Sequence, residues 1–226
     1  PRGVSRTFAI DTVMKEHARV VQEFRADLDE FHEWLLSVGD DVVAAPLDLP
    51  SGSDRDEVLN DLLDQYEVQI GYCISKNDSD LLQRTIETMI NRQLDAQGDQ
   101  YRRLNSVTMT GETEMETVRD TLATLEADDP DRPIDAIVAT SMISHGVDAD
   151  KFNFISFFGM PRNTAEYIQA YSRVGRKTPG TVFVLFNAMQ ARDRSHYGRF
   201  EHYHRYQDLL VEATPLERWA EFAIEC

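Results

Sequence analysis

The clearest chemical signal in the sequence is a pair of arginines in the segment QAYSRVGR, residues 169–176. Arg173 and Arg176 are three residues apart at the end of a predicted helix, so we expect them to point to the same side. Planar, permanently charged guanidinium groups are suited to stabilising the charge on a γ-phosphoryl group during its transfer. Gly175 allows a turn that brings Arg176 close to such a group. Two arginines on a solvated helix end are also a common surface feature, so the pair alone leaves both interpretations open.

A second group of polar residues lies in the segment ATSMISHGVDAD, residues 139–150. A predicted strand ends in Thr140 and Ser141, and the chain then turns through His145, Gly146 and Asp148. We expect this turn to place small hydroxyl groups and one carboxylate at the same edge of the sheet as the arginines.

The elements that would position these residues alternate between strand and helix. Short apolar runs predict buried strands at 68–75, 104–110, 134–140, 152–159 and 181–187. Helices are predicted between them at 77–94, at 114–125 and from residue 163 onward. This alternation indicates an α/β fold with a largely parallel sheet, in which ligands meet the loops at the carboxyl ends of the strands.

The helix that carries the arginines has a recognisable start. Asn163 opens it, and Glu166 follows three residues later in the spacing of a capping box. We therefore expect these two side chains to satisfy the first backbone N–H groups of this helix.

The first 66 residues show a purely helical pattern. Apolar residues spaced three and four apart from 11 to 37 predict one long amphipathic helix that ends at Gly39, and a second short helix follows around 58–63. We divide the chain into a helical extension or linker at 1–66, a central lobe at 67–190 and a helical tail at 191–226.

Together these segments resemble the motifs of superfamily-2 helicases. Motif V of that family runs Ala-Thr, a few residues, then Arg-Gly-apolar-Asp, and motif VI runs Gln-x-x-Gly-Arg-x-Gly-Arg. The segment GYCISKNDSD (71–80) resembles motif IV, and VTMTGETEMETVRDTL (107–122) resembles the family's strand, glycine-containing loop and helix. The resemblance covers about residues 68–190. It implies a RecA-like, P-loop NTPase-type parallel sheet flanked by helices, the second of two such lobes.

The resemblance also implies roles for the matching residues. Arg173 and Arg176 match the motif VI arginines that act as fingers on ATP bound mainly to the other lobe, and Gln169 matches the glutamine that organises that cleft. Gly146 and Asp148 match the motif V pair that couples nucleotide to nucleic acid. Contacts to the nucleic-acid backbone, which carry no sequence information, are implied for Thr110, Gly111, Thr140 and Ser141, and less strongly for Ser75, Lys76 and Asn77.

Two positions depart from the family pattern. Ser172 replaces the usual first glycine of motif VI, and a side chain this small keeps the turn. His145 replaces the common arginine of motif V. Because histidine is mostly neutral near pH 7, the phosphate or interdomain pairing usual for that arginine is not carried over.

Two segments near the C-terminus narrow the resemblance to one group of helicase-like proteins. The segment TAEYIQAYSRVGR (164–176), followed by ARDRSHYGRFEHYHRY (191–206), resembles the large helicase-like subunits of DISARM-type phage-defence systems. Antiviral defence, and other defence subunits as partners, are implied. His196, His202 and His204 have no i, i+4 spacing and no clustered cysteine nearby, so we predict no metal site and a packed, aromatic-rich helix.

Two signatures of ATP hydrolysis are missing from residues 1–226. The sequence contains no GxxxxGK[ST] loop and no strand followed by Asp-Glu to hold Mg²⁺, and it opens with Pro1 rather than Met. We expect a fragment of a longer protein whose first RecA-like lobe holds ATP and Mg²⁺, and no hydrolysis by this part alone. The alternative is a non-catalytic RecA-like scaffold for partner proteins, distinguished by whether a Walker A loop precedes Pro1. We favour DNA over RNA as the nucleic acid that the protein binds.

The charge of the chain is at odds with nucleic-acid binding. The formal net charge is −17, whereas nucleic-acid binders present basic surfaces. Aspartate outnumbers glutamate and lysine is scarce, which resembles proteins adapted to high salt, with an ordinary acidic protein as the alternative. One basic island remains at 160–177, which contains Arg162, Arg173, Arg176 and Lys177 against Glu166 alone.

Other classes of protein are disfavoured by simple counts. No run approaches about 18 uninterrupted apolar residues, and no secretory signal pattern is present, so no membrane segment is predicted. Cys73 and Cys226 are too few for a disulfide framework and form no CxxC motif. A reducing, cytoplasmic location is therefore expected.

Overall fold

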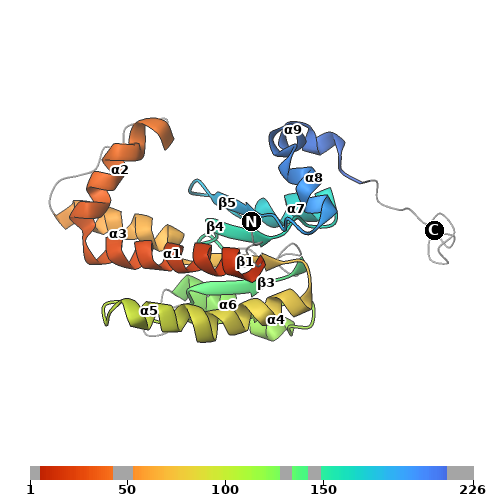
Figure 1. The fold of residues 1–226 in the computed structure, drawn as a ribbon. Coiled ribbons are helices and arrows are strands. Elements are labelled where there is room, and N and C mark those ends of the chain that lie inside the picture. The colour runs from red at the N-terminus through yellow and green to blue at the C-terminus, as the bar shows by residue number, and fades with distance from the viewer. Residues whose placement is uncertain (1–5, 43–52, 128–133, 142–148, 213–226) are drawn as a thin grey trace, which may run out of the picture.

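The computed structural model describes residues 6–42, 53–127, 134–141 and 149–212. Its centre is a five-stranded, wholly parallel sheet with the strand order β2-β3-β1-β4-β5 (Figure 1). The strands are β1 (Gln69–Cys73), β2 (Ser106–Met109), β3 (Ala136–Ala139), β4 (Phe154–Phe158) and β5 (Thr181–Leu185). All five predicted strands are confirmed, each a few residues shorter than predicted.

Helices connect and cover these strands. They are α1 (Arg6–Ala26), α2 (Leu28–Val42), α3 (Ser53–Glu67), α4 (Lys76–Thr85), α5 (Asn91–Gln97), α6 (Met115–Ala127), α7 (Thr164–Tyr171), α8 (Ala191–Tyr197) and α9 (Phe200–Tyr206). A π-helical turn, η1 (Ile86–Ile90), joins α4 to α5, and a 3-10 turn, η3 (Gln207–Leu209), follows α9. None of the helices within the described ranges is long and apolar enough to cross a membrane.

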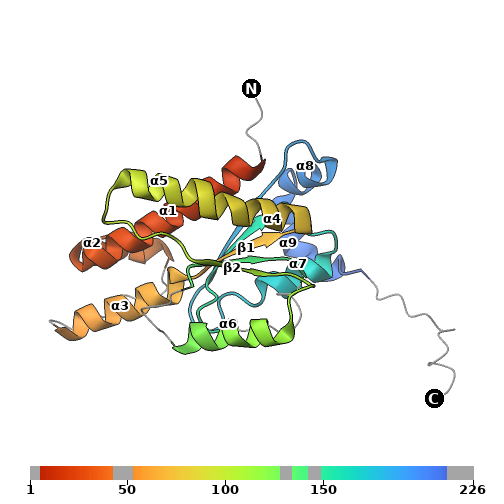
Figure 2. The same cartoon turned by 90° about the horizontal axis from the view of Figure 1, so that it is seen from below.

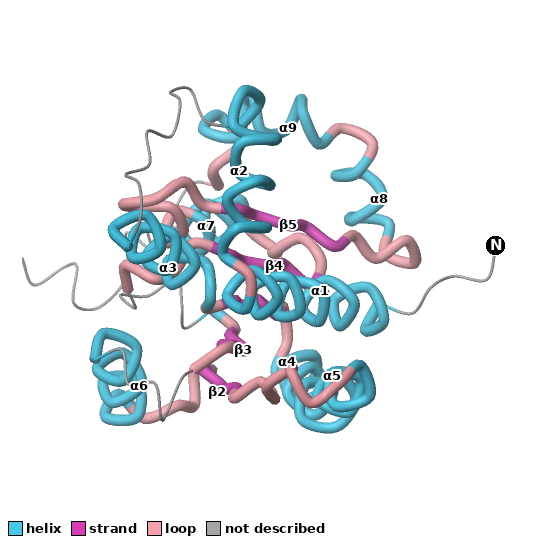
Figure 3. Tube along the Cα trace, turned by 90° about the vertical axis from the view of Figure 1, so that its left-hand side faces the viewer, coloured by secondary structure: helices cyan, strands magenta, loops and turns pink. Residues whose placement is uncertain are grey.

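The sheet is the middle of three layers. Helices α1, α4 and α5 cover one face, and α6 and α7 cover the other (Figures 2 and 3). Side chains alternate between the faces, so on β1 Tyr72 packs toward α7 while Cys73 packs toward α1. Because both faces are covered, the inner strands are continuous apolar runs. The predicted α/β architecture is confirmed.

The helical N-terminal region differs from its prediction. The single helix expected at 11–37 is two helices that meet at Asp27, whose Oδ1 accepts the N–H of Glu30 at 3.0 Å and so starts α2. The predicted end at Gly39 is also wrong, because α2 continues to Val42. A glycine inside a helix costs only about 1 kcal/mol relative to alanine, which neighbouring turns can offset.

Helix α1 contributes directly to the core of the central lobe. Ile10, Met14 and Ala18 are buried together with Cys73 and Phe158 on one face of the sheet. Helices α2 and α3 instead form a small second core with the end of α1, centred on buried Phe31, Leu59 and Leu63. The division of the chain at residue 66 stays a prediction, but α1 and the sheet share one hydrophobic layer.

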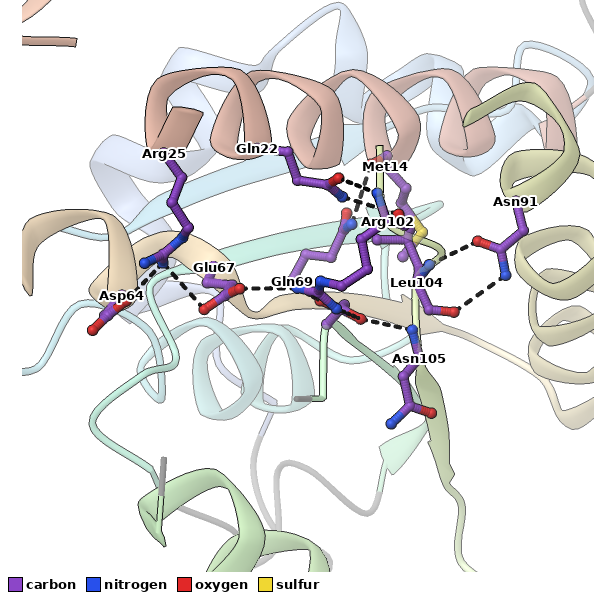
Figure 4. Close-up of polar contacts among 11 residues, drawn as sticks. Met14, Gln22, Arg25, Asp64, Glu67, Gln69, Asn91, Arg102, Leu104 and Asn105 are labelled. Carbon is purple, nitrogen blue, oxygen red and sulfur yellow. Dashed lines mark hydrogen bonds and ion pairs between the residues drawn. The ribbon is translucent and has the colours of Figure 1, made fainter. Parts of the chain in front are cut away.

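A network of charged residues connects α1 and α3 to the amino edge of the sheet (Figure 4). Asp135 is buried, and its carboxylate accepts two N–H groups of Arg102 at 2.8 and 2.6 Å and the backbone N–H of Asn105 at 2.6 Å. Arg102 also contacts Glu67 at 3.0 Å. Burial raises the pKa of Asp135, and the Arg102 guanidinium opposes that rise.

The same network continues to α1 through a second arginine. Arg25 contacts Asp64 at 2.6 Å and Glu67 at 3.3 Å, so both acidic side chains near the end of α3 are held by guanidinium groups. The last turn of α3 is therefore fixed between α1 and the strands.

Replacing Arg102 with methionine should destabilise the fold by about 3 kcal/mol near pH 7, because a buried carboxylate loses its partner. A carboxyl whose folded pKa is raised stabilises the protein only while it is protonated, so the deficit should shrink as the pH falls toward about 4. Urea unfolding at both pH values measures this. Arg103→Met, which removes an exposed pair with Asp95, is the control and should match the wild type. A pH-independent deficit would contradict the assignment.

Candidate functional site

A pocket of about 610 Å³ opens at the carboxyl edge of the sheet. The ends of β1, β2 and β3, which are neighbours in the sheet, form one wall. The backbone N–H of Thr140 donates to the carbonyl of Met109 at 3.1 Å and holds two of these ends together. The pocket brings together six of the predicted site residues, namely Lys76, Thr110, Gly111, Thr140, Ser141 and Gln169.

The pocket also contains residues that were not among the predicted site residues. Arg162, Asn163 and Glu166 line it from the segment after β4 and the start of α7, and Glu112 lines it from the loop after β2. The signal for them was present in the sequence, because all four follow predicted strands at the same edge. Gln169, expected in a nucleotide cleft, lines this pocket too.

The pocket contains both positive and negative groups. Lys76 forms an ion pair with Glu112, and this contact raises the pKa of the Lys76 ammonium group. More than half of each side chain is exposed, so the pair is weakened by solvent and can exchange for another anion. Glu166 accepts a hydrogen bond from the Tyr72 hydroxyl at 2.5 Å, and burial together with this carboxylate raises the pKa of Tyr72.

The loop after β2 is ordered by its own threonines. The backbone N–H of Thr110 donates to Thr113 Oγ1 at 2.9 Å, and the Thr113 N–H donates to the Thr110 carbonyl at 2.9 Å. Gly111 at the tip is exposed, and a Cβ built on it would meet no atom within 4 Å. The loop therefore leaves its backbone open to a close approach from the pocket.

Ser75 does not line the pocket. Its hydroxyl caps α4 instead, because Ser75 Oγ accepts the N–H of Asp78 at 3.2 Å and donates to Asp78 Oδ2 at 2.9 Å. The helix that begins here points its first N–H groups toward the carboxyl edge of the sheet, next to Lys76.

The predicted capping box at the start of α7 is wrong. The Asn163 side chain makes no capping hydrogen bond, and Glu166 is turned toward Tyr72. The Glu212 carboxylate, which arrives from the C-terminal tail, accepts the N–H of Thr164 at 2.9 Å and that of Ala165 at 3.3 Å. These backbone donors hold the pKa of Glu212 below its usual range.

The two arginines lie at the opposite edge of the sheet, and the prediction of a shared edge is wrong. A helix that follows a parallel strand runs back along it, so α7 ends near the start of β4. The N–H of Gly175 donates to the carbonyl of Phe152, just ahead of β4, at 3.0 Å. Arg176 is exposed and Arg173 is half-buried. Gly146 and Asp148 lie outside the described residues.

The turn that carries the arginines is tight. Gly175 has a φ of +80°, and a Cβ on it would lie 2.7 Å from the backbone nitrogen of Gly180. Only glycine fits this conformation and this contact. Just after Arg176, Lys177 forms an ion pair with Asp150, which precedes β4.

The C-terminal tail forms two short helices, α8 and α9, where one packed, aromatic-rich helix was predicted, and its aromatic residues pack on α7. The hydroxyl of buried Tyr167 contacts His204 Nε2 at 2.9 Å, and the other ring nitrogen of His204 contacts the Phe200 carbonyl at 2.8 Å. Buried Asp193 anchors α8 by accepting the N–H of Asn187 at 2.8 Å. Within the described part of the chain, no three histidine, cysteine or acidic residues are grouped as a metal site would require.

A wholly parallel sheet of this order, with helices on both faces, is the architecture of a RecA-like lobe. The structure of the DUF1998 helicase MrfA bound to DNA and AMPPNP has this fold, with a TM-score of 0.50 over 74% of this chain and 22% of that chain. The two sequences are 14% identical, so this likeness concerns the fold alone.

Residues 54–178 match the family described as helicase conserved C-terminal domain, and the chain belongs to that family. The chain is also 31% identical over 175 residues to the DISARM protein DrmA of Bacillus paralicheniformis (strain ATCC 9945a / NCIMB 11709 / CD-2). This match covers 75% of the chain but only 16% of the relative's length. The predicted resemblance to second helicase lobes, and to DISARM subunits in particular, is confirmed.

Replacing Glu212 with alanine should cost about 1 kcal/mol, the usual contribution of a helix cap. Because the folded pKa of Glu212 is lowered, this contribution exists above the unfolded pKa and is lost as the pH falls through the folded one. Thermal unfolding at pH 7 and at about pH 3 tests both statements. Glu57→Ala, at an exposed position inside α3, is the matched control. If the two variants are equally stable at pH 7, Glu212 does not stabilise the start of α7 as a cap.

Proposed function

We propose that this chain is the second lobe of an ATP-dependent nucleic-acid helicase or translocase and that its carboxyl-edge pocket binds the backbone of a strand. The observation that carries this proposal is the convergence of Lys76, Thr110, Gly111, Thr140 and Ser141 on one pocket in a member of a helicase family. Hydroxyl groups, backbone amides and one or two cations suit phosphates and are indifferent to base sequence.

Arg162 joins the strand-binding residues in this proposal. It lines the same pocket as Lys76, so two cations are available there to a phosphate. A phosphate replaces the Glu112 carboxylate on Lys76 at little cost, because that ion pair is exposed. Glu112 and Glu166 lower the positive potential of the pocket, and this favours weak, reversible contacts suited to a moving strand.

The turn that carries Arg173 and Arg176, called the arginine turn below, supplies the second half of the proposed function. Arg173 and Arg176 act as fingers on the γ-phosphate of ATP, and Gly146 and Asp148 couple that site to the strand. Gln169 lines the pocket from α7 and lies four residues before Arg173, a position suited to relaying between the pocket and the turn. The first lobe holds Mg²⁺ and most of the ATP, because residues 1–226 lack the phosphate loop and the Asp-Glu pair. This part alone is therefore inactive.

The likeness to a DISARM protein supports a role in antiviral defence. In this proposal the nucleic acid bound in the pocket is DNA, other defence subunits are the partners of the protein, and the protein works in the cytoplasm. The acidic, lysine-poor composition fits a protein that works at high salt.

A non-catalytic scaffold is the competing proposal. The net charge of −17 and the two carboxylates in the pocket favour it, since both oppose binding of a polyanion. The two proposals differ in whether ATP turnover depends on the arginines and strand binding on Lys76.

In the full-length protein, Arg176→Ala should lower nucleic-acid-stimulated ATP turnover by on the order of 10³-fold, the contribution of an arginine finger. Strand binding should persist, because Arg176 lies at the other edge of the sheet from the pocket. Steady-state ATPase assays and fluorescence anisotropy with a labelled single strand measure the two properties. Arg205→Ala, an exposed arginine on α9, is the control. Unchanged turnover in Arg176→Ala would refute the motor and leave the scaffold.

Lys76→Ala should weaken binding to every single strand by about the same factor, whatever the sequence of the strand. It should also reduce the slope of log Kd against log salt concentration by about 1, because one phosphate contact is lost. Titrations of two unrelated DNA sequences and one RNA at several salt concentrations give both quantities. Arg92→Ala removes the same charge from an exposed site on α5 outside the pocket. If both variants behave alike, Lys76 makes no specific phosphate contact.

A further inference from the structure

The turn that carries the arginines is held by a helix from a distant part of the sequence. The hydroxyl of Tyr66, on the last turn of α3, donates a hydrogen bond to the carbonyl of Pro179 at 2.7 Å, and the two residues are 113 positions apart. Next to this contact, Thr178 Oγ1 donates to Gln65 Oε1 at 3.3 Å. Two consecutive residues of α3 thus contact two consecutive residues of the turn.

A third contact connects α3 to the start of β4. Asn153 donates its side-chain N–H groups to the carbonyl of Gln65 at 2.7 Å and to that of Asp150 at 3.1 Å. The carbonyl of Asn153 also accepts the N–H of Thr181 at 2.8 Å, immediately after the turn. The end of α3, the start of β4 and the far side of the turn therefore form one hydrogen-bonded unit.

The near side of the turn is fixed by β4 as well. Gly175 donates to the carbonyl of Phe152, and its backbone touches that of Gly180, so residues 175–180 form a nearly closed loop. Arg176 lies inside this loop, and Arg173 lies two residues before Gly175. Movement of the far side, where Pro179 contacts Tyr66, therefore acts directly on Arg176 and reaches Arg173 through Val174 and Gly175.

The helix that holds the turn is itself firmly anchored. Arg25 binds Asp64 and Glu67 on the last turn of α3, and Arg102 joins Glu67 to buried Asp135 (Figure 4). Tyr66 lies between these two acidic residues in sequence and is half-buried. Burial raises the pKa of Tyr66, so its hydroxyl keeps its proton and donates at neutral pH.

We propose that Tyr66, assisted by Gln65, is a positioning residue for nucleotide hydrolysis: it clamps the 175–180 turn to α3 and fixes the arginines in the direction that ATP requires. This inference rests on the proposed role of Arg173 and Arg176. A finger stabilises a transferring phosphoryl group only when its guanidinium is held in place, and a misplacement of about 1 Å costs on the order of 10²-fold in rate. Helix α3 thereby acquires a function in the nucleotide site without touching the nucleotide.

The test is Tyr66→Phe in the full-length protein, which keeps the ring and removes only the hydrogen bond to Pro179. We expect kcat for strand-stimulated ATP hydrolysis to fall about tenfold, because the turn loses one of its anchors while the others remain. The KM for ATP, the Kd for a labelled single strand and the melting temperature should stay close to wild-type values. Tyr197→Phe, an exposed tyrosine of α8, is the matched control and should behave like the wild type.

Two comparisons separate the possible failures. If Tyr66→Phe keeps full turnover while Arg176→Ala loses it, the clamp is refuted and the proposed function stands. If Arg176→Ala also keeps full turnover, the proposed function fails and the clamp fails with it. If Tyr66→Phe weakens strand binding and lowers the melting temperature together with kcat, its role is general stability, and the positioning role is refuted. Gln65→Ala should give a smaller fall in kcat than Tyr66→Phe, because its contact with Thr178 is longer.

Discussion

The all-parallel sheet constrains every other feature of this lobe. Strands that run in one direction oblige the chain to return to the amino edge before each new strand begins. Residues that directly follow a strand therefore gather at the carboxyl edge, and residues at the end of a returning helix gather at the other. Thr110, Thr140 and Lys76 belong to the first group, whereas Arg173 and Arg176 belong to the second. The two groups of residues therefore lie at opposite edges of the sheet.

Each edge is completed by a segment from outside the strand-and-helix repeat. At the amino edge, α1 and α3 form the charged network around Asp135 and Glu67 and contact the arginine turn. At the carboxyl edge, the tail brings Glu212 to the first N–H groups of α7. Neither addition carries a recognisable motif. Both fix the ends of elements whose other residues are the proposed ligand contacts.

All five strands could be predicted from the sequence, because a strand buried on both faces is a nearly continuous apolar run. It also identified most of the pocket, because residues after neighbouring strands converge. It failed where the deciding partner is distant in sequence. The capping box at Asn163 was locally plausible, but Glu212, 48 residues on from Thr164, caps the helix. The break at Asp27 has a local cause instead, because its capping side chain outweighed an otherwise continuous apolar period. The prediction of a shared edge was wrong because α7 runs back along β4, so its two ends lie at opposite edges of the sheet.

Helix α7 reaches from the pocket to the turn that carries the arginines. Its first turn lines the pocket at Asn163 and Glu166, and its last residue is followed directly by Ser172 and Arg173. It contains eight residues, so it spans about 12 Å. Buried Tyr167 at its centre packs against the sheet and the tail, and a helix held in this way moves as a rigid body. If a nucleic acid bound in the pocket shifts the first turn of α7, as the proposed function requires, the shift is passed along the helix to the turn that carries the arginines. The proposed Tyr66 contact holds the other end of that turn and resists the shift.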